Sequence, residues 1–227
     1  MNRYRHEYKY FLDAMQESIL LIRAQGMLQR DKHTGERGFY WIRSLYFDDV
    51  HNTCFYENVN GTDRRSKFRI RYYNNNTSYI NLEKKSKVKG MTRKESCRIT
   101  LEECRMLMNG EIPTFVSDSD EMKKKLFLEM QIRGLQPKVI VTYRRVPFVY
   151  SVGNVRITFD QNITSSIEIA KFLEGNYQER PILTKGSSIL EVKWDEILPL
   201  HIREHMKIDG LHWTNFSKYY MCRTYHL

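Results

Sequence analysis

Basic side chains recur at two-residue spacing in several short segments, and this spacing could gather many cations on one surface. Lys67, Arg69 and Arg71 share one parity of the segment 66–73, while apolar residues take the other. Alternate residues of a strand point to the same face. A guanidinium fork matches two phosphate oxygens, and an ammonium supplies compact charge. The segment therefore predicts a strand with one apolar face and one face suited to polyanions.

The same alternation occurs in the other predicted strands with charged faces, which are segments 4–12, 79–88, 155–160 and 189–195. Taken singly, each segment also fits an ordinary half-buried sheet with a solvated outer face. The polar faces, however, carry Arg and Lys with single carboxylates between them, and the like charges on such a face repel one another. Closing the sheet into a barrel with these faces inward is costly unless a polyanion neutralises them. The pattern therefore favours a β-barrel that binds an anionic ligand.

Further segments predict the elements that would position these faces. Asp13 can cap a helix that Gly26 ends, and Thr100 with Glu103 forms a capping-box pattern. Strands are predicted at 4–12, 38–47, 66–73, 78–88, 91–99, 138–145, 155–159 and 188–194. Helices are predicted at 13–26, 101–109 and 119–132, with a short helix or turn at 50–58 and two short helical pieces after Leu198. No repeat or linker divides the chain, so residues 1–227 are expected to form a single α+β domain.

Composition limits the class of protein. The 227 residues carry a net charge of +10, and 41% are hydrophobic, which is too apolar for a disordered polycation. No apolar run approaches the roughly 20 residues of a membrane span, and no secretory signal is apparent. The four cysteines and seven histidines lack zinc-ligand spacing. We expect a cytoplasmic protein with a polyanionic partner such as nucleic acid, phosphate chains, nucleotide or acidic lipid.

Nine short motifs, each weak alone, together carry a family resemblance. In order along the chain they are RHEYKY, YFDD, KFRIRYY, LEKK, GMTRKE, VTYRR, VRITFD, ILEVKW and SKYY. The chain thereby resembles the vacuolar transporter chaperone (VTC) domain, the polyphosphate-polymerase branch of the CYTH-like triphosphate tunnel metalloenzymes. The resemblance implies an antiparallel tunnel of about eight strands with helices outside and a helical C-terminal tail. Its inward cations would hold ATP, triphosphate or polyphosphate, and an acidic residue would bind Mn²⁺ or Mg²⁺.

The resemblance also assigns site residues. The basic phosphate ligands with a catalytic role would be Lys9, Arg69, Arg71, Lys85, Arg145, Arg156 and Lys218. Further substrate contacts would come from Lys94, Tyr143, Lys193 and Ser217. Glu191 matches the metal ligand, although an ion pair with Lys193 or a tunnel arginine is the alternative. Glu7 could position metal or water, but Glu7 and Asp160 fit better as structural partners of neighbouring arginines.

One departure from the superfamily bears on the reaction. Hydrolytic and cyclase members begin with ExExK, whereas this strand has Arg5, Glu7 and Lys9 at those positions. The loss of one carboxylate weakens the hypothesis of a two-metal triphosphatase. It favours instead transfer of the ATP γ-phosphate to a polyphosphate chain. A tripolyphosphatase or nucleoside triphosphatase and a non-catalytic polyphosphate binder remain alternatives.

The predicted strands also bear on partners and location. Nucleic acid is a poor candidate, because the aromatic residues face away from the cations. The resemblance leaves room for a separate membrane-protein partner and for recruitment to a membrane surface.

Overall fold

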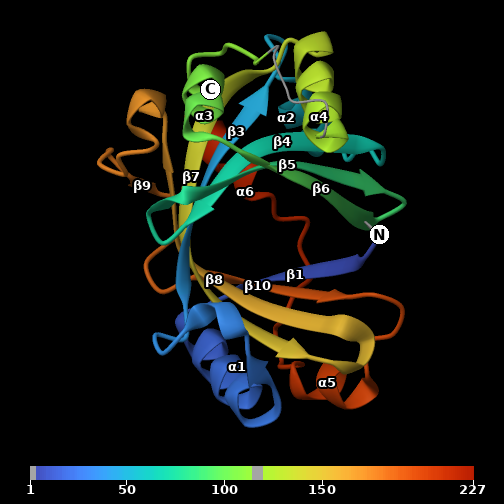
Figure 1. Ribbon diagram of the computed structural model, residues 1–227. Coiled ribbons are helices and arrows are strands. Elements are labelled where there is room, and N and C mark those ends of the chain that lie inside the picture. Colours follow the sequence, from blue (N-terminus) through green and yellow to red (C-terminus); the bar gives the residue numbers. More distant parts are fainter. Residues whose placement is uncertain (1–3, 114–119) are drawn as a thin grey trace.

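An antiparallel sheet curls around the centre of the molecule (Figure 1), and the computed structural model describes residues 4–113 and 120–227. Eight strands follow one another in the order β1-β10-β8-β7-β3-β4-β5-β6. Their bounds are β1 His6–Leu12, β3 Tyr40–Asp48, β4 Arg65–Tyr73, β5 Asn76–Val88, β6 Met91–Ile99, β7 Gln136–Tyr150, β8 Val155–Ser166 and β10 Ser188–Trp194. Short strands β2 Gln29–Arg30 and β9 Arg180–Pro181 pair with β7 and β8. The predicted α+β antiparallel tunnel is confirmed.

The two edge strands of the sheet approach each other at one point. Arg5, which precedes β1, and Thr92 of β6 exchange two backbone hydrogen bonds of 2.9 Å each. This bridge brings the first and last strands of the sheet together, so that the inward faces of the strands surround a common space.

Helices α1, α3, α4 and α5 lie on the outside of the curled sheet (Figure 1). The α-helices are α1 Ala14–Met27, α2 Thr53–Val59, α3 Leu101–Met108, α4 Glu121–Ile132, α5 Leu200–His205 and α6 Lys218–Thr224. Short 3-10 turns cover Lys32–Thr34, Val152–Asn154 and Ile169–Lys171. In the described residues, no helix has the length and apolar character needed to cross a membrane.

Local signals explain where two of these helices begin. The side chain of Asp13 accepts a 2.8 Å hydrogen bond from the backbone N–H of Gln16, which starts α1. Thr100 and Glu103 form the predicted capping box of α3. The predicted helix at 119–132 corresponds to α4, and its first residue, Ser119, lies outside the described residues.

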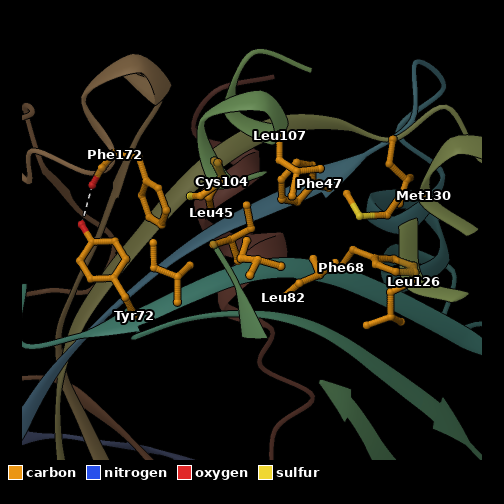
Figure 2. Close-up of a cluster of buried hydrophobic side chains, with 14 of the residues drawn as sticks. Leu45, Phe47, Phe68, Tyr72, Leu82, Cys104, Leu107, Leu126, Met130 and Phe172 are labelled. Carbon is orange, nitrogen blue, oxygen red and sulfur yellow. Dashed lines mark hydrogen bonds between the residues drawn. The ribbon is translucent and has the colours of Figure 1, made fainter. Parts of the chain in front are cut away.

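The apolar parity of the strands packs against the helices. Figure 2 shows Phe68 and Leu82 of the sheet facing Leu107 of α3 and Leu126 of α4. A second cluster buries Leu20 of α1 against strands β7, β8 and β10. Because both clusters occupy the outer face, the charged parity of the same strands must point into the barrel. The apolar burial on one face thus positions the cations on the other.

Strands β7 and β8 are longer than predicted. The predicted strand 138–145 ended before Pro147, a residue that cannot donate a hydrogen bond to a strand ladder. In the structure β7 continues through Pro147, whose carbonyl oxygen accepts a hydrogen bond from the backbone N–H of Asp31. The tight turn at 151–154 then joins β7 to β8. The carbonyl of Pro147 can still accept a hydrogen bond, and β8 pairs with this segment across the tight turn. These two interactions are sufficient to keep the segment extended.

Candidate functional site

A cavity of about 800 Å³ lies inside the curled sheet. Its lining contains fourteen basic residues and four acidic ones. All thirteen predicted site residues lie on it, namely Glu7, Lys9, Arg69, Arg71, Lys85, Lys94, Tyr143, Arg145, Arg156, Glu191, Lys193, Ser217 and Lys218. The structure therefore brings together residues from both ends of the chain around one strongly cationic space.

One wall of the cavity, the Glu83 wall, consists of Glu83 on β5 with Arg69, Arg71 and Lys94. Arg69 donates from Nε and Nη2 to Oε2 of Glu83 at 2.8 and 2.6 Å, and Lys94 Nζ donates to Oε1 at 2.9 Å. The Arg71 Nη1 atom lies 3.9 Å from Oε2. Burial opposes ionisation of Glu83, which is 1% exposed, but Arg69, Arg71 and Lys94 outweigh it and lower its pKa. Glu83 is thus an ionised carboxylate that aligns three cations.

Neutral groups fix the two arginines of this wall further. Arg71 donates from Nε to Ser44 Oγ at 2.9 Å and from Nη2 to the Tyr143 hydroxyl at 3.1 Å. Arg69 donates from Nη1 to the Tyr46 hydroxyl at 3.0 Å. These bonds hold the guanidinium planes in place before any ligand binds, which lowers the entropic cost of binding one.

The opposite wall, the Glu191 wall, consists of Glu191 and Asp160 with Arg145, Lys193 and Lys218. Asp160 accepts from Arg145 Nε and Nη2 at 2.6 and 2.7 Å, and Lys218 Nζ lies 2.6 Å from its Oδ2 atom. Glu191 accepts from Lys218 Nζ at 3.0 Å, Lys193 Nζ at 2.9 Å and Arg145 Nη2 at 3.2 Å. Two carboxylates therefore share one arginine and one lysine in this wall.

The charges of the Glu191 wall stabilise one another. Burial opposes ionisation of Glu191, but Lys193, Lys218, Lys9 and Arg145 together hold the pKa of this carboxyl well below its usual range. Burial lowers the pKa of Lys218, yet Asp160 and Glu191 reverse the effect and raise it. Glu191, Asp160, Arg145 and Lys218 consequently form a network of charged groups at neutral pH.

Glu7 on β1 connects Lys85 of β5 to Lys193 of the Glu191 wall. Lys85 Nζ donates to its two oxygens at 2.6 and 3.0 Å, and Lys9 and Lys193 lie 3.5 and 3.8 Å away. Burial disfavours the charge of Glu7, but these three lysines hold the pKa of its carboxyl well below the usual range. Lys9 and Lys193 also contact Glu191, at 3.8 and 2.9 Å. Two carboxylates that share two lysines therefore lie side by side in the tunnel.

Arg156 lies in a different setting from the other predicted basic ligands. Its Nη2 atom donates to the Tyr40 hydroxyl at 2.8 Å and pairs with Asp31 Oδ2 at 2.7 Å. The Arg156 side chain is 34% exposed, the highest value among the seven predicted catalytic residues. Solvent therefore weakens its field more than it does for Arg71 or Lys218.

Sequence reasoning missed several residues that shape the site. Glu83 shares a parity with Lys85, which places it inside the barrel, but it was not among the predicted site residues. Asp48 of the YFDD motif accepts hydrogen bonds from Cys54 N, Phe55 N and the Tyr219 hydroxyl, and so anchors α6 beside α2. Lys67 lines the cavity as well, and no local pattern distinguishes it from the neighbouring arginines.

The carboxylates that could hold a divalent ion are Glu191 and Glu7. Both line the cavity, whereas Glu83 and Asp160 lie behind the basic side chains. In the described parts of the chain, no three His, Cys, Asp or Glu side chains gather into a metal-binding group. One or two carboxylates completed by phosphate oxygens and water form a typical Mg²⁺ site at phosphate-binding enzymes. The donor set therefore fits a metal that arrives with a phosphate ligand.

Comparison with solved structures identifies the fold. A candidate adenylyl cyclase from Hippeastrum, with a dominant triphosphatase activity, superposes with a TM-score of 0.55 at 16% identity, covering 97% of this chain and 95% of that one. A candidate adenylate cyclase from Bacillus halodurans gives 0.52 at 14% identity, covering 90% and 86%. No curated protein sequence matches the chain significantly.

Comparison with protein families identifies the chain itself. The VTC domain model matches residues 4–226, which is nearly the whole sequence. The chain therefore belongs to the VTC domain family and has the triphosphate tunnel fold.

Proposed function

We propose that this protein is a divalent-metal-dependent phosphotransferase that moves the γ-phosphate of ATP onto a polyphosphate chain inside the tunnel. The observation that carries the proposal is the cavity lining, in which fourteen basic residues face four acidic ones. Such an excess of enclosed positive charge is stable only with a polyanion to neutralise it. A chain of phosphates supplies closely spaced negative charge along its whole length.

The two walls suit the two demands of phosphoryl transfer. In such reactions the protein mainly positions donor and acceptor in line and neutralises charge on the moving phosphoryl group. Arg69 and Arg71, aligned by Glu83, would clamp phosphate oxygens on one side. Arg145 and Lys218 would approach them from the other side. No protein nucleophile is required for this chemistry.

Glu191 and Glu7 would hold Mn²⁺ or Mg²⁺ at the substrate. The ion would add positive charge at the phosphate oxygens, where negative charge is greatest. Lys9 and Lys193, which contact both carboxylates, would move toward the phosphates when the ion takes their place. This arrangement uses the carboxylates of the tunnel as ligands and its lysines as mobile counter-charges.

The position of Arg5 favours transfer over hydrolysis. Arg5 pairs with Asp195 through Nε and Oδ1 at 2.6 Å, in the place where hydrolytic relatives are expected to carry a carboxylate. A cation there cannot ligate a second metal or activate a water molecule. The likeness to the Hippeastrum protein keeps a triphosphatase as the second candidate on the same tunnel.

The decisive experiment follows phosphate chains directly. Purified protein is incubated with ATP and Mn²⁺, with and without a short polyphosphate primer, and products are resolved by length on a gel. Chain growth in the wild type that disappears in Arg71→Ala and Glu191→Ala is the expected result. Arg98→Ala and Glu204→Ala, which alter exposed residues away from the cavity, are the matched controls.

Other products would identify the alternatives. Release of orthophosphate without chain growth would move the protein to the triphosphatase function. Binding of tripolyphosphate without any metal-dependent turnover would leave a polyphosphate-binding module.

A further inference from the structure

Lys67 on β4 lines the same cavity as Arg69 and Arg71 but has different partners. Its Nζ atom donates to Asn58 Oδ1 at 3.0 Å and to Ser217 Oγ at 2.9 Å. The same atom lies 5.2 Å from the centre of the Tyr219 ring. Across residues 4–113 and 120–227, no carboxylate oxygen lies within 4.0 Å of this ammonium group. Lys67 is therefore held in place only by neutral groups.

This environment sets Lys67 apart from the cations of the two walls. Arg69 and Lys218 each contact a carboxylate at 3.0 Å or less, and an incoming phosphate must compete with that carboxylate. Lys67 has no such competitor within 4.0 Å among the described residues, and Glu57 of α2 acts on it only from farther away. A partly buried cation whose hydrogen bonds go only to neutral oxygens gains more from a new anion than one already in an ion pair.

The electrostatic surroundings of Lys67 favour the binding of an anion. Its position inside the barrel lowers its pKa to about 7, and repulsion from neighbouring cations adds to the effect. The charged and titratable groups that face it are Lys9 of β1, Cys54 and Glu57 of α2, Arg65 of β4, Lys85 of β5 and Tyr219 of α6. Of these, the three basic side chains oppose its charge, and an anion placed among them would be attracted by all four.

We propose that Lys67, held by Asn58 of α2 and Ser217 beside α6, forms a further phosphate subsite of the tunnel, which binds a phosphate group of the chain and takes up a proton as it does so. The inference rests on the proposed function in one respect, because it assumes that the tunnel binds phosphate chains. Ser217 precedes Lys218 in the chain, so the subsite adjoins the Glu191 wall. The proton comes from solvent and remains on the Lys67 amine while the phosphate is bound.

Calorimetric titration with tripolyphosphate tests the subsite. At pH 6.5 the Lys67 amine is largely charged, and Lys67→Met should weaken binding by about tenfold, as expected for loss of one charge-assisted contact. At pH 8 the wild type should take up about one proton more than Lys67→Met, because binding raises a pKa that starts near 7. Repeating each titration in buffers of different ionisation enthalpy measures this uptake.

Lys67→Arg provides the sharper test. A guanidinium stays protonated at any accessible pH, so this variant should keep its affinity at pH 6.5 and lose the extra proton uptake at pH 8. A merely structural role for Lys67 would not produce this separation of affinity from proton uptake. If Lys67→Met does not fold, as judged by thermal unfolding, Lys67→Arg carries the test alone. Lys185→Met, at an exposed position outside the cavity, is the control.

Two results would overturn the inference in distinguishable ways. If both Lys67 variants match the wild type in affinity and proton uptake while Arg71→Ala loses binding, the tunnel binds phosphate and Lys67 is no subsite. If the wild type does not bind tripolyphosphate at all, the proposed function fails and the subsite fails with it.

Discussion

The two walls of the tunnel arrange carboxylates and cations in opposite ways. In the Glu83 wall one carboxylate lies behind three cations, and the cations face the cavity. In the Glu191 wall Asp160 lies behind Arg145 and Lys218, but Glu191 itself lines the cavity. The Glu83 wall therefore presents only positive charge to a ligand, whereas the Glu191 wall presents both signs.

This difference separates two tasks that one cationic surface could not perform together. A wall of aligned arginines suits the binding of phosphate oxygens, since each guanidinium can engage two of them. A wall that also exposes a carboxylate can accept a divalent ion along with the phosphates. We therefore expect substitutions in the Glu83 wall to change substrate affinity, and substitutions of Glu191 to change metal dependence. Five predictions test this division.

Loss of Asp160 should have the largest effect, and it should be on stability. Asp160→Asn removes the bidentate partner of Arg145 and a partner of Lys218, so two buried cations would depend on Glu191 alone. Breaking a buried ion pair from one side typically costs about 3–5 kcal/mol of unfolding free energy. Urea denaturation at pH 7 measures this, with Glu204→Gln at an exposed pair as the control. A loss below about 1 kcal/mol would show that Asp160 is dispensable.

Glu191 and Glu83 should differ in what their loss does to turnover. Glu191→Gln should lower metal-dependent turnover by about 100-fold or more, a typical cost for removing charge stabilisation at a reacting centre. Glu83→Gln should chiefly raise the KM for ATP, because it releases Arg69 and Arg71 without touching the metal. Titration of Mn²⁺ against activity separates the two. Equal metal dependence in both variants would contradict the division between the walls.

The fork geometry of Arg71 should matter more than its charge. Arg71→Lys keeps the charge but cannot bond Ser44 and Tyr143 while engaging two phosphate oxygens. We expect kcat/KM to fall by about tenfold, the equivalent of one lost hydrogen bond to a charged group. Steady-state kinetics measure this. Full activity in Arg71→Lys would show that charge alone suffices at this position.

Acid should destabilise both walls. Neighbouring cations lower the pKa values of Glu7, Glu83, Asp160 and Glu191 against the opposing effect of burial. Groups with a lowered pKa in the folded state contribute stability that is present above their unfolded pKa, which is 4.5 for the three glutamates and 3.8 for Asp160, and is lost as pH falls below it. The melting temperature should therefore fall progressively below pH 4.5, and less steeply in Glu83→Gln. An unchanged melting temperature down to pH 3 would contradict this.

Lys94→Met should have the smallest effect on stability. The Lys94 side chain contacts Glu83 but is 52% exposed, and an ion pair so open to solvent contributes at most about 1 kcal/mol. The KM for ATP should rise only severalfold, in contrast to Arg71→Lys, as steady-state kinetics would show. A loss of activity as large as that of Glu191→Gln would mean that the Glu83 wall also takes part in chemistry.

Much of the fold follows from local signals in the chain. The alternation around Arg69 and Arg71 predicted the strand and its inward face, and the capping box at Thr100 predicted the start of α3. Each depends on neighbours within a few residues, so no tertiary information was needed. The continuation of β7 past Pro147 was not predicted. It pairs with β8 along its whole length, and the Pro147 carbonyl also contacts Asp31, which is remote in sequence.

The partners within the site were less predictable. The thirteen predicted residues do line one cavity, since the family motifs placed them on inward faces. Lys67, however, meets Ser217 across 150 positions of the chain, and Glu83 meets Arg69 across 14. The first contact arises only when α6 closes on the curled sheet, and the second requires the register in which β4 pairs with β5.

The segments LEKK and LEVK separate what the sequence determines from what tertiary contacts decide. Both place a glutamate two residues before a lysine on a strand, so the sequence alone determined that Glu83 and Glu191 would point into the barrel beside cations. It could not determine which would face a ligand. Arg69 and Arg71 cover Glu83, because β4 pairs directly with β5, and the Glu83 carboxylate becomes a support for these arginines. Glu191 lies on β10 between β1 and β8, where its cationic neighbours leave it on the cavity surface.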